Sequence, residues 1–323
     1  MLHFGTEEQK PQWLPLFATG SSLLTIAVTE WDPSPMQHCT TRKQEELHMA
    51  ERKVCLVTGA SSGIGLAVAL ELVRSGHTVY GAARRVNRME GLRAAGGHPI
   101  AMDVSRDEDV ARVVRTVLDT QGRLDVLVNN AGLGLHGSIE DTPLEKARHL
   151  FEVNLFGAAR LVQLVLPAMR TQGSGTIVNV SSIGGEIALP LGAWYYASKH
   201  ALEAFSDSLR QELGRFGVRV VLIQPGIIKT EFEKGTAQEL RDVSGHGAYA
   251  SMAEAMAKRA EQAFSGKSKA SDPLVVAEAI REAINSPSPE ARYVVGYLGR
   301  LLLMLNRVLP DRAWDRMVTG RLG

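Results

Sequence analysis

The chain has 323 residues, enough to bury one large hydrophobic core or two small ones. Its 45% hydrophobic and 22% charged residues are typical of a soluble globular protein, and a formal net charge of +1 gives no reason to expect nucleic acid as a partner. With only Cys39 and Cys55, a disulfide framework or a cysteine-rich metal site is not expected. We therefore expect a cytoplasmic protein without a metal.

Residues 1–48 show no sustained hydrophobic periodicity and contain four prolines: Pro11, Pro15, Pro33 and Pro35. The mildly apolar segment 13–28 is interrupted by proline, glycine and serine and is short for a membrane span. It has neither a basic leader nor a clear cleavage site, so we expect no signal peptide. The regular pattern begins after Met49. This predicts a poorly ordered extension over 1–48 and a single domain over 49–323.

From residue 54 the chain alternates short apolar runs with amphipathic segments. The apolar runs predict buried strands at 54–57, 78–82, 99–102, 126–128, 176–180 and 218–223. The segments between them predict helices at 64–74, 87–95, 108–119, 145–170 and 193–216. Strands that are apolar throughout and alternate with helices are typical of a sheet covered on both faces. We therefore predict an α/β fold, a doubly wound parallel sheet of the Rossmann type.

After residue 226 the alternation weakens, and we expect a lid and further helices over about 231–323. The polar, glycine-interrupted segment 231–269 predicts a helical lid. Asp272-Pro273 is typical of a helix start, here reaching about residue 285, and 292–295 predicts a last edge strand. Residues 298–318 are apolar and basic at helical spacing. We favour packing of this helix on the domain or on a neighbouring subunit over contact with a membrane surface.

A glycine-rich turn links the first predicted strand to the first predicted helix. Glycine lets the backbone turn tightly and approach a pyrophosphate, which the free N–H groups of a helix N-terminus then bind. The alternative is an ordinary glycine-rich turn. We predict dinucleotide binding by Gly59, Ser61, Ser62, Gly63, Ile64 and Gly65.

The second predicted strand ends in Ala82-Ala83-Arg84-Arg85, without an acidic residue in reach. An acid at this place usually binds a free ribose 2′-hydroxyl and would repel a 2′-phosphate. Arginine instead binds a phosphate through charge-assisted hydrogen bonds. We therefore predict NADP(H) rather than NAD(H), bound through Arg84. Two surface arginines in a loop are the alternative, which stays open for Arg85 in particular.

Tyr195 and Lys199 lie four residues apart in a predicted helix and therefore project from one face. The ordinary pKa of tyrosine is about 10, and a lysine cation one turn away favours the phenolate. Tyr195 is thus a candidate for proton exchange near neutral pH. The same spacing also fits a half-buried tyrosine beside a solvated lysine. Tyr196 points about 100° around the helix, and we expect it to be structural.

In unbroken order from about residue 53 to 230, the motifs resemble those of the short-chain dehydrogenase/reductase family: Thr58-Gly59-x-x-x-Gly63-x-Gly65, Asn129-Asn130-Ala131-Gly132, Asn154, Ser182 and Tyr195-x-x-x-Lys199. The resemblance implies that Tyr195 is the general acid and base. Lys199 would lower its pKa and hold the nicotinamide ribose. Ser182 would hydrogen-bond the substrate oxygen, and Asn154 would hold a water in the proton relay. By the same resemblance, the remaining cofactor contacts would come from Asp103, Val104, Asn130, Ala131, Gly132, Pro225, Gly226, Ile228 and Thr230.

The long C-terminal part and the segment 225–232 resemble the hydroxysteroid and retinol dehydrogenase-like members. This resemblance implies a hydrophobic ketone, aldehyde or secondary alcohol as substrate, and a homodimer or homotetramer. An apolar wall near the reacting carbon would come from Ile187, Ala188, Leu189, Leu191 and Trp194. Two alternatives stay open: a 3-ketoacyl-thioester reductase and a non-catalytic NADP-sensing protein. The complete set of catalytic motif residues argues against the sensor, because a binding module needs no proton relay.

Overall fold

The computed structural model describes residues 52–231, 235–264 and 269–320. The extension predicted over residues 1–48 lies outside the described residues. The hydrophobic clusters of the described chain are built from Val54 onward.

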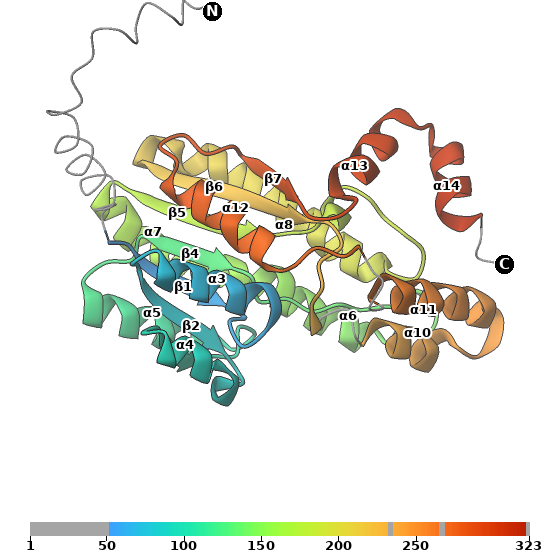
Figure 1. The fold of residues 1–323 in the computed structure, drawn as a ribbon, viewed down its shortest axis with the longest axis horizontal. Coiled ribbons are helices and arrows are strands. Elements are labelled where there is room, and N and C mark those ends of the chain that lie inside the picture. Colours follow the sequence, from blue (N-terminus) through green and yellow to red (C-terminus); the bar gives the residue numbers. More distant parts are fainter. Residues whose placement is uncertain (1–51, 232–234, 265–268, 321–323) are drawn as a thin grey trace, which may run out of the picture. The chain divides into compact units, whose positions relative to one another are not determined.

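Seven strands form one sheet in the order β3-β2-β1-β4-β5-β6-β7, and all neighbouring strands are parallel (Figure 1). This confirms the predicted doubly wound parallel sheet. The expected edge strand is present, and the third strand begins one residue earlier than predicted. The strands are β1 (Val54–Thr58), β2 (Thr78–Ala83), β3 (His98–Ala101), β4 (Val126–Asn129), β5 (Gly175–Val180), β6 (Val218–Pro225) and β7 (Arg292–Val295).

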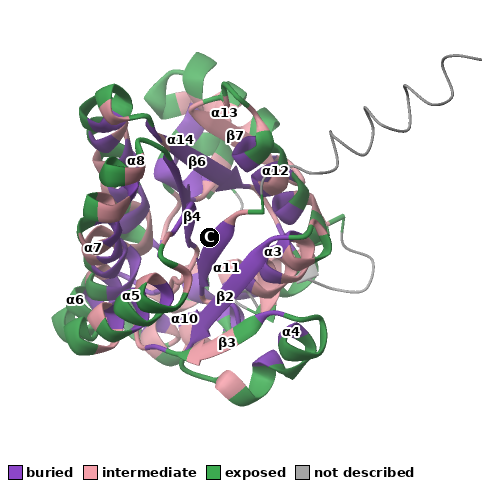
Figure 2. Ribbon diagram, turned by 90° about the vertical axis from the view of Figure 1, so that its left-hand side faces the viewer, coloured by how far each residue is buried: buried purple, intermediate pink, exposed green. Residues whose placement is uncertain are grey.

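Helices cover both faces of the sheet, because every central strand is apolar on both sides. On one face α3 (Gly63–Arg74), α4 (Glu90–Ala94) and α12 (Leu274–Asn285) pack in one hydrophobic cluster. On the other face α5 (Asp107–Gln121), α7 (Gly157–Gln172) and α8 (Ala193–Leu213) pack in a second. Figure 2 shows the buried strands between these two layers of helices, whose outer surfaces are exposed.

The helix predicted over 145–170 is two helices joined by a π-helical turn. α6 (Leu144–Phe151) leads into the turn η2 (Glu152–Phe156), and α7 continues from Gly157. A π-turn adds one residue to the helical repeat, and such turns are frequent at functional sites. Leu144–Gln172 is long and apolar enough to cross a membrane by composition, but 44% of its most apolar window is buried inside the domain. The buried residues of α7 pack in the core against the sheet.

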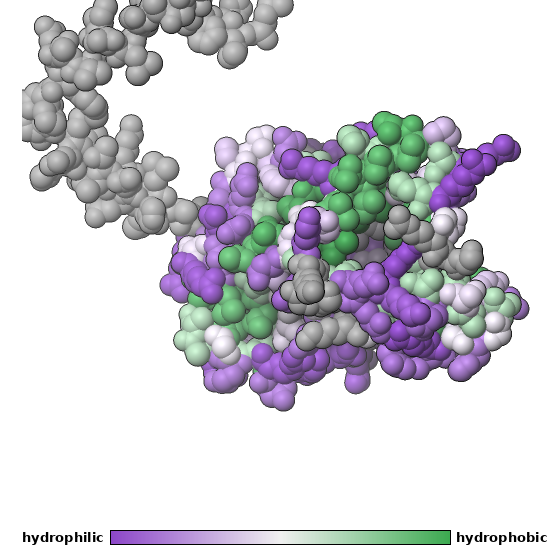
Figure 3. Space-filling view, turned by 45° about the vertical axis from the view of Figure 1, so that its right-hand side comes forward, coloured by the Kyte–Doolittle hydropathy of each residue, from purple (hydrophilic) through white to green (hydrophobic). Residues whose placement is uncertain are grey.

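The C-terminal part differs from the sequence expectation in its last helix. The predicted lid contains two helices, α10 (Thr236–Ser244) and α11 (Ala250–Phe264). The helix predicted over 298–318 is broken into α13 (Gly299–Val308) and α14 (Asp311–Thr319). Pro310 has no N–H to donate and disfavours a helical conformation of Leu309, whose backbone is extended at ψ 135°. Figure 3 shows apolar side chains gathered in the upper part of the face that includes α13.

Candidate active site

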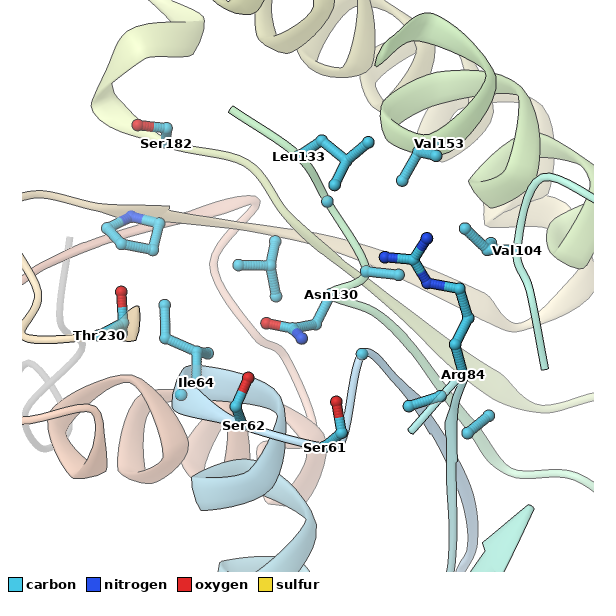
Figure 4. Close-up of a pocket in the computed structure, with 18 of the residues that line it drawn as sticks. Ser61, Ser62, Ile64, Arg84, Val104, Asn130, Leu133, Val153, Ser182 and Thr230 are labelled. Carbon is cyan, nitrogen blue, oxygen red and sulfur yellow. The ribbon is translucent and has the colours of Figure 1, made fainter. Parts of the chain in front are cut away.

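A cavity of about 240 Å³ lies at the carboxyl ends of the parallel strands. Here the strand order reverses, which is the general ligand position in open α/β sheets. Figure 4 shows side chains from the turn after β1, the ends of β2 and β4, and the helix layer around it. All but two of the site residues predicted from the sequence line this cavity. The exceptions are Gly65 and Asn154, which lie behind its wall.

The glycine-rich turn is held by Thr58 and Asn130. The Thr58 hydroxyl oxygen accepts hydrogen bonds from the backbone N–H groups of Asn130 (3.0 Å) and Ala131 (2.9 Å). The Asn130 side-chain amide donates to the Thr58 carbonyl at 2.9 Å. A Cβ on Gly59 would lie 2.8 Å from the Asn130 amide nitrogen, and one on Gly65 would lie 2.4 Å from it. Gly65 is therefore required by close packing beneath the turn rather than by the cavity itself.

Both arginines after β2 line the cavity. Figure 4 shows the Arg84 guanidinium reaching toward Asn130 and Val104. Arg85 Nη2 donates to the hydroxyl oxygens of Ser61 (3.4 Å) and Ser62 (3.3 Å) in the glycine-rich turn. From the sequence, Arg85 stayed open as a surface loop residue, and its contact with the turn was missed. The only signal that could have found it is that Arg85 follows Arg84 at the same strand end.

Asp103, predicted to contact adenine, lines the cavity after β3. Partial burial opposes its ionisation, but hydrogen bonds from the Ser105 hydroxyl (2.7 Å) and backbone N–H (3.0 Å) outweigh that effect. The nearby charge of Arg84 acts in the same direction, so that the pKa of Asp103 lies below its ordinary value. The carboxylate is thus ionised and available as a hydrogen-bond acceptor at neutral pH.

Ser182, Tyr195 and Lys199 face one cavity from the end of β5 and the first turns of α8. Lys199 is buried, and its Nζ donates to the Val180 carbonyl at 3.0 Å. The same nitrogen lies 6.0 Å from the centroid of the Tyr195 ring. Burial lowers the pKa of Lys199 to about 8, while the charge of Glu203 opposes that shift. A cation therefore stands beside the phenol at neutral pH.

Asn154 lies in the π-turn and joins three segments. Its Oδ1 accepts from the Leu133 N–H at 2.7 Å, and its Nδ2 donates to the Leu133 carbonyl at 3.0 Å. The same Nδ2 donates to the Ser198 hydroxyl at 3.0 Å, and that hydroxyl donates to the Tyr195 carbonyl at 2.7 Å. A Cβ on Gly132 would lie 3.4 Å from Asn154 Oδ1 and 3.8 Å from Lys199 Nζ. Asn154 is thus close behind the lysine, and its role in holding a water stays a prediction.

Ser182 begins the loop between β5 and α8, and its hydroxyl oxygen accepts from the Gly184 N–H at 3.0 Å. Tyr196 packs against both ends of this loop. A Cβ on Gly184 would lie 2.9 Å from the Tyr196 ring, and one on Gly192 would lie 2.6 Å from it. This contact gives Tyr196 the structural place expected from the sequence. Tyr195 instead faces the cavity.

The apolar residues of this loop do not form one wall, contrary to the sequence expectation. Ile187 and Leu189 pack with Trp314 of α14, Leu191 packs with α10 and α11, and Trp194 packs with Leu133 and Leu135. The loop is therefore shared among three hydrophobic clusters. Contacts with residues distant in the sequence determine which cluster each side chain joins. The spacing of residues within the loop does not reveal these contacts.

His136 and Glu239 connect α10 to the active site. The His136 ring centroid lies 6.1 Å from that of Tyr195. Glu239 of α10 accepts from the His136 backbone N–H at 3.0 Å and lies 3.2 Å from its Nδ1. This contact was not expected from the sequence. In the described part of the chain, no group of three or more histidine, cysteine or acidic residues could hold a metal ion.

The burial of Lys199 predicts a pH-dependent cost in stability. Its pKa of about 8 lies below the ordinary 10.5, so between these pH values the unfolded chain holds the proton that the folded chain has released. The free energy of unfolding therefore rises with pH across this window. We expect Lys199→Met to be more stable than the native protein at pH 7, by roughly 1–3 kcal/mol. Urea unfolding should show this advantage shrinking above pH 8, and a constant difference would contradict the prediction.

Comparison with known sequences identifies the family. The model of the short chain dehydrogenase family matches residues 53–241. Over 265 residues the chain is 38% identical to the probable short-chain type dehydrogenase/reductase VdlC of Helicobacter pylori, covering 82% of this chain and 96% of that protein. It is 39% identical over 194 residues to human retinol dehydrogenase 8, covering 57% of this chain and 61% of that protein.

Comparison with solved structures points to the same family. A short-chain dehydrogenase from Streptomyces avermitilis has a TM-score of 0.69 and 35% identity, over 84% of this chain and 99% of its own. An alcohol dehydrogenase from Thermococcus sibiricus, complexed with 5-hydroxy-NADP, has a TM-score of 0.62 and 27% identity, over 76% of this chain and 97% of its own. The chain belongs to the short-chain dehydrogenase/reductase family.

Proposed function

We propose that this protein is an NADP(H)-dependent oxidoreductase that interconverts a hydrophobic ketone or aldehyde and its alcohol. The observation that carries the proposal is the meeting of Ser182, Tyr195 and Lys199 in the cavity that the glycine-rich turn also lines. Oxidoreductase chemistry follows from the family, whereas the cofactor preference and the substrate class are our inference.

The residues of the cavity fit a nicotinamide dinucleotide phosphate. The N-terminus of α3 has no side-chain cap, so its backbone N–H groups are free for a pyrophosphate. Two glycines of the turn have positive φ, +69° at Gly59 and +54° at Gly63, a conformation that other residues rarely adopt. Arg84 and Arg85 provide cations for a ribose 2′-phosphate. The complex of the Thermococcus sibiricus relative with 5-hydroxy-NADP supports this choice.

When bound, the cofactor supplies or accepts the hydride. In reduction, Tyr195 donates its phenolic proton to the carbonyl oxygen, which becomes the hydroxyl of the alcohol. Ser182 donates a hydrogen bond to the same oxygen, and the Lys199 cation stabilises the phenolate that remains. In oxidation, the phenolate of Tyr195 takes the proton back from the alcohol. The buried lysine and the hydrogen bonds of Asn154 hold these groups in place before substrate arrives.

A hydrophobic substrate is supported by apolar side chains in the cavity itself. Leu133, Val153 and Val180 line it together with Ser182, Tyr195 and Lys199. Similarity to human retinol dehydrogenase 8 is in accord with a large apolar alcohol. We also propose a cytoplasmic homodimer or homotetramer. Leu144 and Phe156, exposed on the long helix pair, support a subunit contact there.

Tyr195→Phe removes the proposed proton donor without changing the size of the ring. We expect turnover of an apolar ketone with NADPH to fall by about 10²–10⁴-fold, while NADPH affinity stays nearly unchanged. Tyr196→Phe is the matched control on the neighbouring residue and should cost far less. The measurements are steady-state kinetics and fluorescence titration of NADPH. Retained turnover in Tyr195→Phe would refute the assignment.

Arg84→Ala and Arg85→Ala test the cofactor preference. Each removes a charge-assisted contact to the 2′-phosphate, so we expect each to weaken NADPH binding by about 10- to 100-fold and NADH binding far less. Arg88→Ala is the control, because Arg88 is paired with Glu231 at 2.6 Å and does not line the cavity. Isothermal titration with both cofactors measures the effect. Equal losses for NADH and NADPH would be inconsistent with an NADP site.

A further inference from the structure

The C-terminal hairpin, which comprises α13 and α14 (residues 299–319), has a packed inner face and an apolar outer face. On the inside, Trp314 is buried against Ile183 and Ile187 of the loop that follows Ser182. On the outside, four large apolar side chains are exposed: Leu301 (45%), Met304 (55%), Val308 (66%) and Met317 (42%). Packing on the domain therefore leaves four of the large apolar residues in this segment exposed.

The exposed apolar residues of α13 form one stripe. Leu301, Met304 and Val308 follow one another at spacings of three and four, which places them on one side of the helix. Leu301 also lines an open groove of about 470 Å³ between α12, β7 and α13, together with Val275 and Leu298. Figure 3 shows the resulting apolar area on this face. Single exposed apolar residues are normal, but a continuous patch of this kind marks an interaction surface.

Exposed arginines lie on the same two helices. Arg300 and Arg307 lie on α13 and Arg312 and Arg316 on α14, and all four are exposed. None of them forms an ion pair with another described residue of the chain. The hairpin has only two acidic residues, Asp311 and Asp315. Its outer face thus combines an apolar stripe with an excess of positive charge.

We propose that the C-terminal hairpin docks on the surface of an anionic lipid bilayer. Leu301, Met304 and Val308 enter the boundary between headgroups and acyl chains, and the arginines lie at the level of the lipid phosphates. A second copy of the chain fits this face less well. A two-fold contact would place two positively charged faces against each other, with too few acids to balance them. The docked hairpin would place the loop after Ser182 close to the membrane, beside a source of apolar molecules.

The test is co-sedimentation of the full chain with vesicles. We expect binding to vesicles of phosphatidylcholine mixed with phosphatidylglycerol, and much weaker binding to phosphatidylcholine alone. Met304→Glu combined with Val308→Glu should weaken binding to the mixed vesicles by at least about tenfold, because two anchoring side chains become charged. Arg300→Glu combined with Arg307→Glu should weaken it by a similar factor and only at low ionic strength.

Matched controls lie elsewhere on the surface. Ile139→Glu changes a side chain that is 58% exposed outside the hairpin, and Arg106→Glu combined with Arg115→Glu reverses two charges near or on α5. Both controls should bind vesicles as the native chain does. Urea midpoints should show that all variants remain folded. Equal vesicle binding by hairpin and control variants would overturn the proposal.

A second outcome would also overturn it. Sedimentation equilibrium would then show that the hairpin variants dissociate an oligomer, while their vesicle binding stays unchanged. These readouts do not depend on the proposed activity.

Discussion

The buried ammonium group of Lys199 is the constraint on which the arrangement of the active site depends. A cation removed from water needs hydrogen-bond acceptors and a compensating charge. The Val180 carbonyl at the end of β5 provides the acceptor at 3.0 Å, and Glu203, one helical turn later, provides the charge. Because the lysine belongs to α8 and its acceptor to β5, this bond fixes the helix at the edge of the sheet where the strands end. Tyr195 is positioned by the same helix.

Hydrogen bonds from buried or half-buried polar side chains hold the neighbouring loops in the same way. Asn154 fastens the chain after β4 to α8 through Leu133 and Ser198, and Asn130 fastens it to the glycine-rich turn through Thr58. Glu203 is itself held by Arg292 of the edge strand β7 at 3.0 Å. The groups proposed for catalysis therefore rest on rigid elements, and the bonds that orient them exist without substrate. Such pre-organisation is what proton transfer at a fixed oxygen requires.

The sequence predicts the sheet more completely than it predicts the details of the site. Apolar runs and chain order predict the parallel sheet, and since parallel strands end at one edge, the motif residues were expected to meet. The π-turn around Asn154 was missed, because one added residue leaves the apolar spacing of a long helix nearly unchanged. Arg84 and Arg85 look alike in sequence, and only the folded structure shows that the Arg85 side chain reaches Ser61 and Ser62. Likewise, an apolar stripe in α13 looks the same in sequence whether it faces the core or the solvent.

The central claim is hydride transfer between NADP(H) and an apolar carbonyl compound at Tyr195. The most direct measurement follows NADPH and NADH oxidation by absorbance with a panel of apolar ketones and aldehydes and a 3-ketoacyl thioester. We predict oxidation of NADPH by at least one apolar ketone or aldehyde, faster than oxidation of NADH and faster than with the thioester. Tight NADPH binding without turnover of any compound would contradict it and favour a cofactor-sensing protein. Preference for the thioester would instead place the enzyme in acyl-chain metabolism.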